Sequence, residues 1–191
     1  MKKTIIIILS VFIYGNLHAQ TELPNTISKE DRIYGLSKFW QEVNYNFVYL
    51  NKINKGKWND DYKRLITEVQ ETKNDYEYYR LLQKFCATLK DGHTNVFFPK
   101  SVDSLIHTTW FGDYRLFLTN IEGKAIVTRV NLSKKDEIPI GTEIIKVNGL
   151  PTSEYSNKYV KPFISSSTEY ILENNMISWL LRSPKGTTEL A

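Results

Sequence analysis

The sequence has little cysteine, little histidine and no long apolar run, and each shortage excludes a class of protein. Its 191 residues include one cysteine and three histidines. No intramolecular disulfide and no cysteine metal cluster can therefore form, and we expect no metal or other cofactor. The longest apolar stretch, residues 4–14, is shorter than the about 20 apolar residues that a membrane-spanning helix needs.

Neither sign of charge dominates the sequence. The 25 basic residues exceed the 21 acidic residues by a net charge of +4, and removal of Lys2 and Lys3, which we expect to be cleaved off, halves that excess. So balanced a charge argues against a nucleic acid or an anionic membrane as partner. With 41% hydrophobic and 24% charged residues, the composition is that of one or two small globular domains.

The N-terminus has the layout of a secretory signal peptide. Met1-Lys2-Lys3 is basic, residues 4–14 are apolar, and Leu17-His18-Ala19 precedes a plausible cleavage point at Gln20. We therefore predict that residues 1–19 are removed and that the mature protein is periplasmic or secreted, with no stable membrane anchor. The alternative interpretation is an uncleaved anchor.

Residues 20–99 predict a small helical domain that ends in a strand. Ser28, with Asp31 three residues later, has the pattern of a helix capping box. Apolar residues recur at helical spacing in three successive segments. The predicted helices begin behind Ser28, at Asn59 or Asp60, and at Asn74-Asp75.

The end of the third helix and the segment after it have a different pattern. Cys86 lies on an apolar helix face, so we interpret it as a small buried hydrophobic residue, and Gly92 can take the left-handed position that ends a helix. Residues 93–98 are rich in β-forming residues and stop at Pro99, which predicts a strand. We interpret residues 100–109 as a linker.

Residues 110–191 predict a second, β-rich domain, so the expected fold class is α+β. Two extended segments, 114–118 and 125–130, flank a turn at Glu122-Gly123, and Asn148-Gly149 is a strong hairpin signal. Two further segments, 153–160 and 167–181, have helical patterns.

Two motifs in this order carry a family resemblance. Asp91-Gly92-His93-Thr94 lies where the third helix runs into the predicted strand, and residues 141–149, Gly-Thr-Glu-Ile-Ile-Lys-Val-Asn-Gly, resemble the G-D-x-I-x-x-V-N-G segment of a PDZ domain. Together with a helical lead-in that contains Trp40 and Trp58, they are similar to the tail-specific, or C-terminal processing, serine peptidases, and closest to their tricorn-like branch. The resemblance covers most of residues 28–191.

The resemblance implies a fold and an activity. The implied fold is a small N-terminal helical domain followed by a PDZ-like domain over residues 110–191, incomplete at its C-terminal end and truncated before an α/β catalytic domain. The implied activity is that of a serine-type endopeptidase, with a polypeptide or its C-terminal tail as substrate. Because the serine nucleophile of the family lies in the catalytic domain, we expect the chain as printed to be inactive alone.

The same resemblance makes His93 the candidate general base. In the tricorn-like branch, the histidine of this motif activates the serine, and imidazole suits that role because its ordinary pKa lies near neutral pH. The tricorn-like pattern has serine where this chain has Gly92. In the processing-peptidase branch a Ser–Lys pair performs the reaction, and His93 would then be structural, bonding a carbonyl at the corner between helix and strand.

The PDZ-like segment implies peptide binding by β-augmentation, in which an extended peptide adds to a sheet edge. Trp110-Phe111-Gly112 occupies roughly the region of the usual G-L-G-F signature, so Phe111 and Gly112 are candidate substrate-binding residues. Two alternatives to the peptidase stay open, a secreted protein that binds peptides without cleaving them and a ligand-binding relative. The sequence leaves the oligomeric state undetermined.

Overall fold

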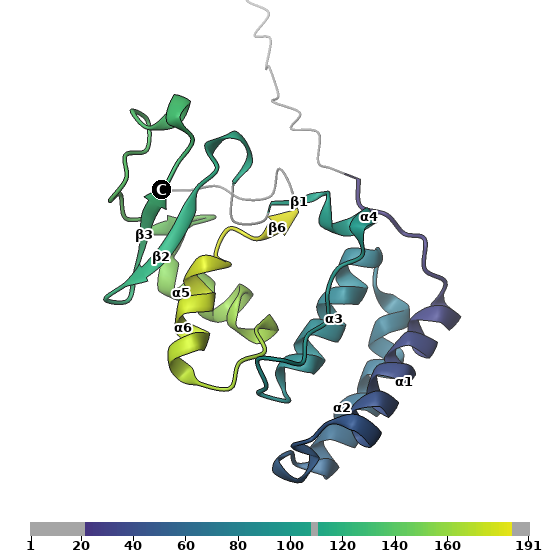
Figure 1. Ribbon diagram of the computed structural model, residues 1–191. Coiled ribbons are helices and arrows are strands. Elements are labelled where there is room, and N and C mark those ends of the chain that lie inside the picture. Colours follow the sequence, from purple (N-terminus) through teal and green to yellow (C-terminus); the bar gives the residue numbers. More distant parts are fainter. Residues whose placement is uncertain (1–21, 108–110, 185–191) are drawn as a thin grey trace, which may run out of the picture.

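The computed structural model describes residues 22–107 and 111–184, and it has a helical half and a second half of small antiparallel sheets and helices (Figure 1). The fold is therefore α+β, as predicted. The predicted signal peptide, Trp110 and the extreme C-terminus lie outside the described residues. Within those residues, no helix is both long and apolar enough to cross a membrane.

Three helices form the first half, as the periodicity predicts. Each begins at a side-chain cap: Ser28 accepts from the amide of Asp31, Asn54 from Lys57, and Asn74 from Glu77. The prediction for the start of the second helix, Asn59 or Asp60, is wrong, because Asn54 caps it five residues earlier. The helices are α1 (Lys29–Asn46), α2 (Lys55–Glu68) and α3 (Asp75–Ala87), with 3₁₀ turns η1 (Leu50–Lys52) and η2 (Val69–Glu71).

A buried ion pair joins α1 to the start of α3. Arg32 and Asp75 are 3% and 2% exposed, and Arg32 Nη2 lies 3.6 Å from Asp75 Oδ1. The Asp75 carboxylate also accepts hydrogen bonds from the amides of Thr26 and Ile27 and from the Thr26 hydroxyl. These bonds compensate the cost of burying the charge, so Asp75 fixes the segment before α1 against α3.

The segment after α3 differs from its prediction in two ways. Lys90, rather than Gly92, takes the left-handed backbone, with φ of 52°. Residues 93–98 are extended and have alternating burial, but they are not a strand, because none of their backbone groups pairs with another backbone group in the described chain. β-forming residues favour an extended chain, but only a partner completes a sheet.

Residues 100–107, in the expected linker, contain regular structure. α4 (Lys100–Asp103) is followed by β1 (Ile106–His107), which pairs antiparallel with β6 (Ser183–Pro184) near the other end of the described chain. Val102 and Ile106 are buried there against aromatic residues of α3. This segment therefore packs on α3 and joins the helical half to the second half.

The second half begins with a hairpin at the predicted Glu122-Gly123 turn. β2 (Phe117–Ile121) pairs with β3 (Lys124–Arg129), and residues 141–144 add on the other side of β3 through backbone hydrogen bonds. The predicted Asn148-Gly149 hairpin is confirmed, since both residues have positive φ between β4 (Lys146–Val147) and β5 (Leu150–Pro151).

Two helices cover these strands, close to their predicted ranges. They are α5 (Thr152–Tyr159) and α6 (Glu169–Ser178), with 3₁₀ turns η3 (Gly112–Tyr114), η4 (Leu132–Lys134) and η5 (Lys161–Phe163). α6 packs against β2, and apolar residues of both halves form separate cores.

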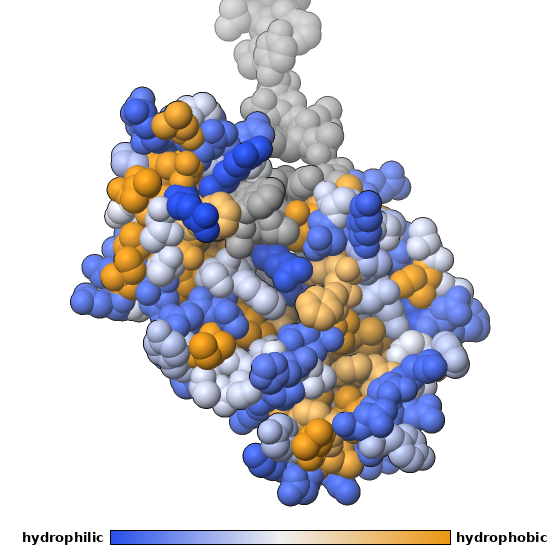
Figure 2. All heavy atoms as spheres, viewed as in Figure 1, coloured by the Kyte–Doolittle hydropathy of each residue, from blue (hydrophilic) through white to orange (hydrophobic). Residues whose placement is uncertain are grey.

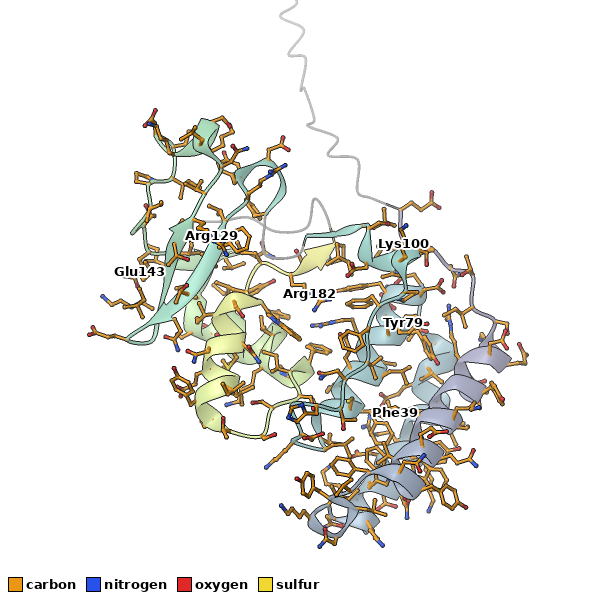
Figure 3. All side chains as sticks on the ribbon, in the orientation of Figure 1. Phe39, Tyr79, Lys100, Arg129, Glu143 and Arg182 are labelled. Atoms are coloured by element: carbon orange, nitrogen blue, oxygen red, sulfur yellow. The ribbon has the colours of Figure 1, made fainter. Side chains whose placement is uncertain are left out.

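Two partly buried arginines lie at the boundary between the two halves. The Arg80 guanidinium of α3 lies 3.3 Å from the ring centroid of Phe163 and donates to the backbone carbonyl of Tyr159. Burial lowers the pKa of Arg80 to about 10. Arg182, from the segment after α6, lies between the halves (Figure 3) and packs on Phe98. Side chains of the second half thus hold α3 in place.

We predict that Asp75→Ala lowers the free energy of unfolding by about 3–5 kcal/mol, because it leaves the Arg32 charge buried without its counter-ion. Urea denaturation measures the change. The control is Asp60→Ala, whose carboxylate is 79% exposed in a pair with Lys63 and should cost less than about 0.5 kcal/mol. Equal losses for the two variants would contradict the role given to Asp75.

Candidate functional site

A groove of about 860 Å³ opens where the connection between α1 and α2 approaches the end of α3 and the residues before α6. Aromatic and aliphatic side chains make much of its wall: Phe47, Tyr49, Ile53, Trp58 and Leu89. Figure 2 shows apolar side chains over this end of the helical half, where Val48 is 83% exposed. The groove can therefore hold an apolar group in contact with His93, which also lines it.

The turn that carries His93 is fixed by hydrogen bonds from its own side chains. The Thr94 hydroxyl donates to the Asp91 carboxylate at 2.6 Å, and the Asn95 amide donates to the carbonyl of Gly92 at 2.9 Å. The Asp91 carboxylate is thus occupied within the turn and does not orient His93. An orienting partner for the imidazole has to come from another segment.

The second half of the chain also holds this turn. The buried Ser165 hydroxyl donates to the backbone carbonyl of Asp91 at 2.6 Å, and the amide of Gly92 donates to Ser167 Oγ at 3.0 Å. Thr168 then caps α6 by accepting from the amide of Ile171. Because these bonds span about seventy residues of sequence, the position of His93 depends on both halves of the molecule.

The His93 side chain is exposed. It lines the first groove and also a second one of about 400 Å³, whose wall includes Phe39, Phe47 and Val48. Within the described chain its imidazole makes no hydrogen bond. The ring is therefore accessible from both grooves and is not engaged in holding the fold.

Lysines give the first groove a positive character. Lys57 donates to Asp61 at 2.8 Å, and Lys52 stands 4.3 Å from the ring centroid of Tyr49. Burial raises the pKa of Asp61, but hydrogen bonds from Lys57 and Arg64 outweigh it and lower that pKa overall. Lys52 and Lys90 have no acidic partner in the described residues, and three lysines face the two carboxylates of Asp61 and Asp91 in the groove lining, so the groove has a small excess of positive charge.

The structure does not bring the other two predicted site residues to this groove. Phe111 and Gly112 lie at the start of η3 with left-handed backbones, φ 42° and 59°, and Phe111 packs against the core of the second half. Neither lines the groove that contains His93. The described residues also contain no group of three or more side chains that could hold a metal ion.

Sequence reasoning missed the residues that hold and surround His93. Ser165 and Ser167 lie just before and at the start of the segment predicted to be helical, 167–181, and the structure shows that they also bond Asp91 and Gly92. Nothing in the local sequence signals that contact. The groove lysines gave no spacing signal either, because they come from three different segments.

Burial of Cys86 beneath the turn confirms its interpretation as a small buried residue, at 1% exposure. Its thiol donates to the carbonyl of Thr94 at 3.1 Å, and burial raises the pKa of the thiol to about 12. The thiolate is the reactive form, so the folded protein should resist alkylation at this position.

We predict that iodoacetamide at pH 8 modifies Cys86 only after unfolding. Because the folded thiol loses its proton at a higher pH than the unfolded thiol, stability should also fall as the pH rises from about 9 toward 12. Mass spectrometry with and without urea tests the first point, and urea titrations of Cys86→Ala test the second, since this variant should show a shallower decline. Rapid modification of the native protein would contradict the burial of Cys86.

Comparison with known proteins gives no family for the chain: no family model matches it, and no curated protein sequence matches it. The features of the structure that bear on function are the turn that carries His93, the groove beside it and the exposed imidazole.

Proposed function

We propose that the chain is the N-terminal portion of an exported serine-type peptidase that acts on polypeptides, with His93 as the general base. The observation that carries the proposal is the exposed imidazole of His93 on a turn fixed by both halves of the molecule. A base must be positioned and still be reachable by the group that it deprotonates; the bonded turn fixes the backbone at His93, and its ring is accessible.

The alternative structural role for His93 has less support. A histidine that pins the corner after α3 would bond a carbonyl, but the imidazole has no such bond in the described chain. The side chains of Asp91, Asn95, Ser165 and Ser167 hold the corner instead. His93 is therefore not needed to fix the turn.

The proposed chemistry is acyl transfer. A serine from a segment outside the described residues attacks the scissile carbonyl while its proton passes to the His93 imidazole, and the imidazolium then gives that proton to the leaving amine. Water hydrolyses the acyl-enzyme with His93 again as base. The lysines of the groove attract acidic groups of the substrate, and its aromatic wall contacts apolar ones.

The proposal also includes a PDZ-like role for the second half in binding substrate tails. The antiparallel arrangement of β2, β3 and residues 141–144, with α6 packed on β2, supports it. Phe111 and Gly112 precede β2 with left-handed backbones, and in this proposal their loop receives the terminal carboxylate of the peptide.

We predict that His93→Ala lowers peptide hydrolysis by the product of the complete reading frame by about 10²–10⁴-fold, the usual contribution of a general base. A chromogenic peptide assay measures the rate, and a fluorophosphonate probe reports the reactivity of the serine. The control is His107→Ala, a histidine in β1, which should keep the wild-type rate.

Three results would count against the proposal. Near-normal turnover by His93→Ala would place the reaction with a Ser–Lys pair or make His93 structural. Equal losses for the two histidine variants would point to destabilisation. Binding of peptides by the wild-type protein without any hydrolysis would favour the peptide-binding alternative.

A further inference from the structure

The extended segment after His93 has one edge with free backbone groups. Burial alternates along it, since Thr94, Val96 and Phe98 face inward while Asn95 and Phe97 are exposed. This is the pattern of a half-buried strand. The segment runs back along α3 (Figure 1) and has no strand beside it in the described chain.

Side chains of α3 occupy the other edge of this segment. The Cys86 thiol donates to the carbonyl of Thr94, and the Gln83 amide donates to the carbonyl of Val96 at 3.0 Å. In an extended chain, the backbone groups of alternate residues point to opposite edges. The carbonyls and amides of Asn95 and Phe97 therefore point away from α3.

These four backbone groups of Asn95 and Phe97 make no hydrogen bond with any described residue. Two donors and two acceptors, spaced two residues apart on a fixed edge, complement the backbone of another extended chain. A side chain or a small molecule would satisfy only part of the set. The ligand that can satisfy all four backbone groups is therefore a polypeptide in β conformation.

A cavity of about 180 Å³ lies between this segment and the second half, and Gln83 and Cys86 of α3 also line it. Asn95 and Phe97 line it on one side, and Phe163, Trp179 and Arg182 on the other. Its volume suits a single side chain of a bound peptide.

The charge of this cavity indicates which side chain it takes. Arg182 has one acidic neighbour, Asp103, at 3.6 Å, and its Nε is buried without a hydrogen-bond partner in the described structure. Arg80, the second arginine at this boundary, is partly buried outside the cavity lining and has no carboxylate partner among the described residues. An acidic side chain would supply the missing acceptor.

We propose that residues 93–98 bind the substrate as an added β-strand, pairing with the backbone of Asn95 and Phe97, and that the adjacent cavity receives an acidic side chain. This inference rests on the proposed function, because it names how the substrate of His93 is held. Asn95 lies two residues after His93, about 7 Å along an extended chain, so a peptide on this edge passes close to the imidazole.

The test uses the chain itself and a peptide with blocked ends. The probe has seven residues, alternating threonine and valine with a central glutamate, so it has no terminal carboxylate for a tail-binding loop. Fluorescence anisotropy measures its binding to the wild type and to two variants at one position. Asn95→Pro removes the backbone donor, whereas Asn95→Ala keeps it.

Asn95→Pro should weaken binding by about five- to tenfold, the value of one hydrogen bond, and Asn95→Ala should stay within about twofold. A central lysine in the peptide should weaken binding to the wild type but not to Arg182→Gln. Thermal melts confirm that each variant is folded. Amide shifts in NMR spectra at Asn95 and Phe97 on peptide addition would locate the contact.

The inference would be overturned if the peptide did not bind. It would also be overturned if Asn95→Pro and Asn95→Ala bound the peptide with equal affinity, whether or not both bound it more weakly than the wild type. Self-association of the chain that Asn95→Pro abolishes would assign the edge to a second copy instead. Failure of the proposed function is measured separately, because hydrolysis by the product of the complete reading frame is compared between the wild type and His93→Ala, whereas this binding is compared between the wild type and the two Asn95 variants.

Discussion

The hydrogen bonds from Ser165 and Ser167 to the backbone of Asp91 and Gly92 are the interaction on which the rest of the site depends. They join the corner after α3 to the loop before α6, across about seventy residues. α3 alone would leave the corner as a helix end with unpaired carbonyls, and the Gly92 amide would lack the acceptor that Ser167 supplies. With the two serines in place, the backbone around His93 has one conformation while its side chain stays accessible.

Contacts of Arg80 and Arg182 also hold the two halves together, close to the loop that contains Ser165 and Ser167. Arg80 of α3 packs on Phe163 and bonds the carbonyl of Tyr159 just before the serine loop, and Arg182 lies between Phe98 and Trp179. The Arg80 guanidinium uses an aromatic ring and a carbonyl in place of a carboxylate, which suits the weakly hydrated arginine, whereas Arg182 also pairs with Asp103. The boundary between the halves is therefore positively charged, and it lies beside the extended segment that follows His93.

Local sequence rules predicted the parts of the fold that depend on local contacts. The three helices, their caps at Ser28 and Asn74, and the Asn148-Gly149 hairpin follow from spacing and turn chemistry. The rules failed where a distant partner decides the structure: residues 93–98 have the composition of a strand, yet no other strand among residues 22–107 and 111–184 pairs with them. For the site, a motif indicated His93, but the serines that hold it and the lysines around it come from segments that only the fold brings together.

At position 90 the backbone conformation favours glycine, whereas the chain has the charged residue Lys90. Its φ of 52° is a backbone conformation that costs a non-glycine residue roughly 1 kcal/mol, and glycine would adopt it without strain. Only a side chain, however, can place an ammonium group in the groove beside His93. The chain is thus less stable at this position than glycine would make it, and the lysine adds a cation to the groove that His93 also lines.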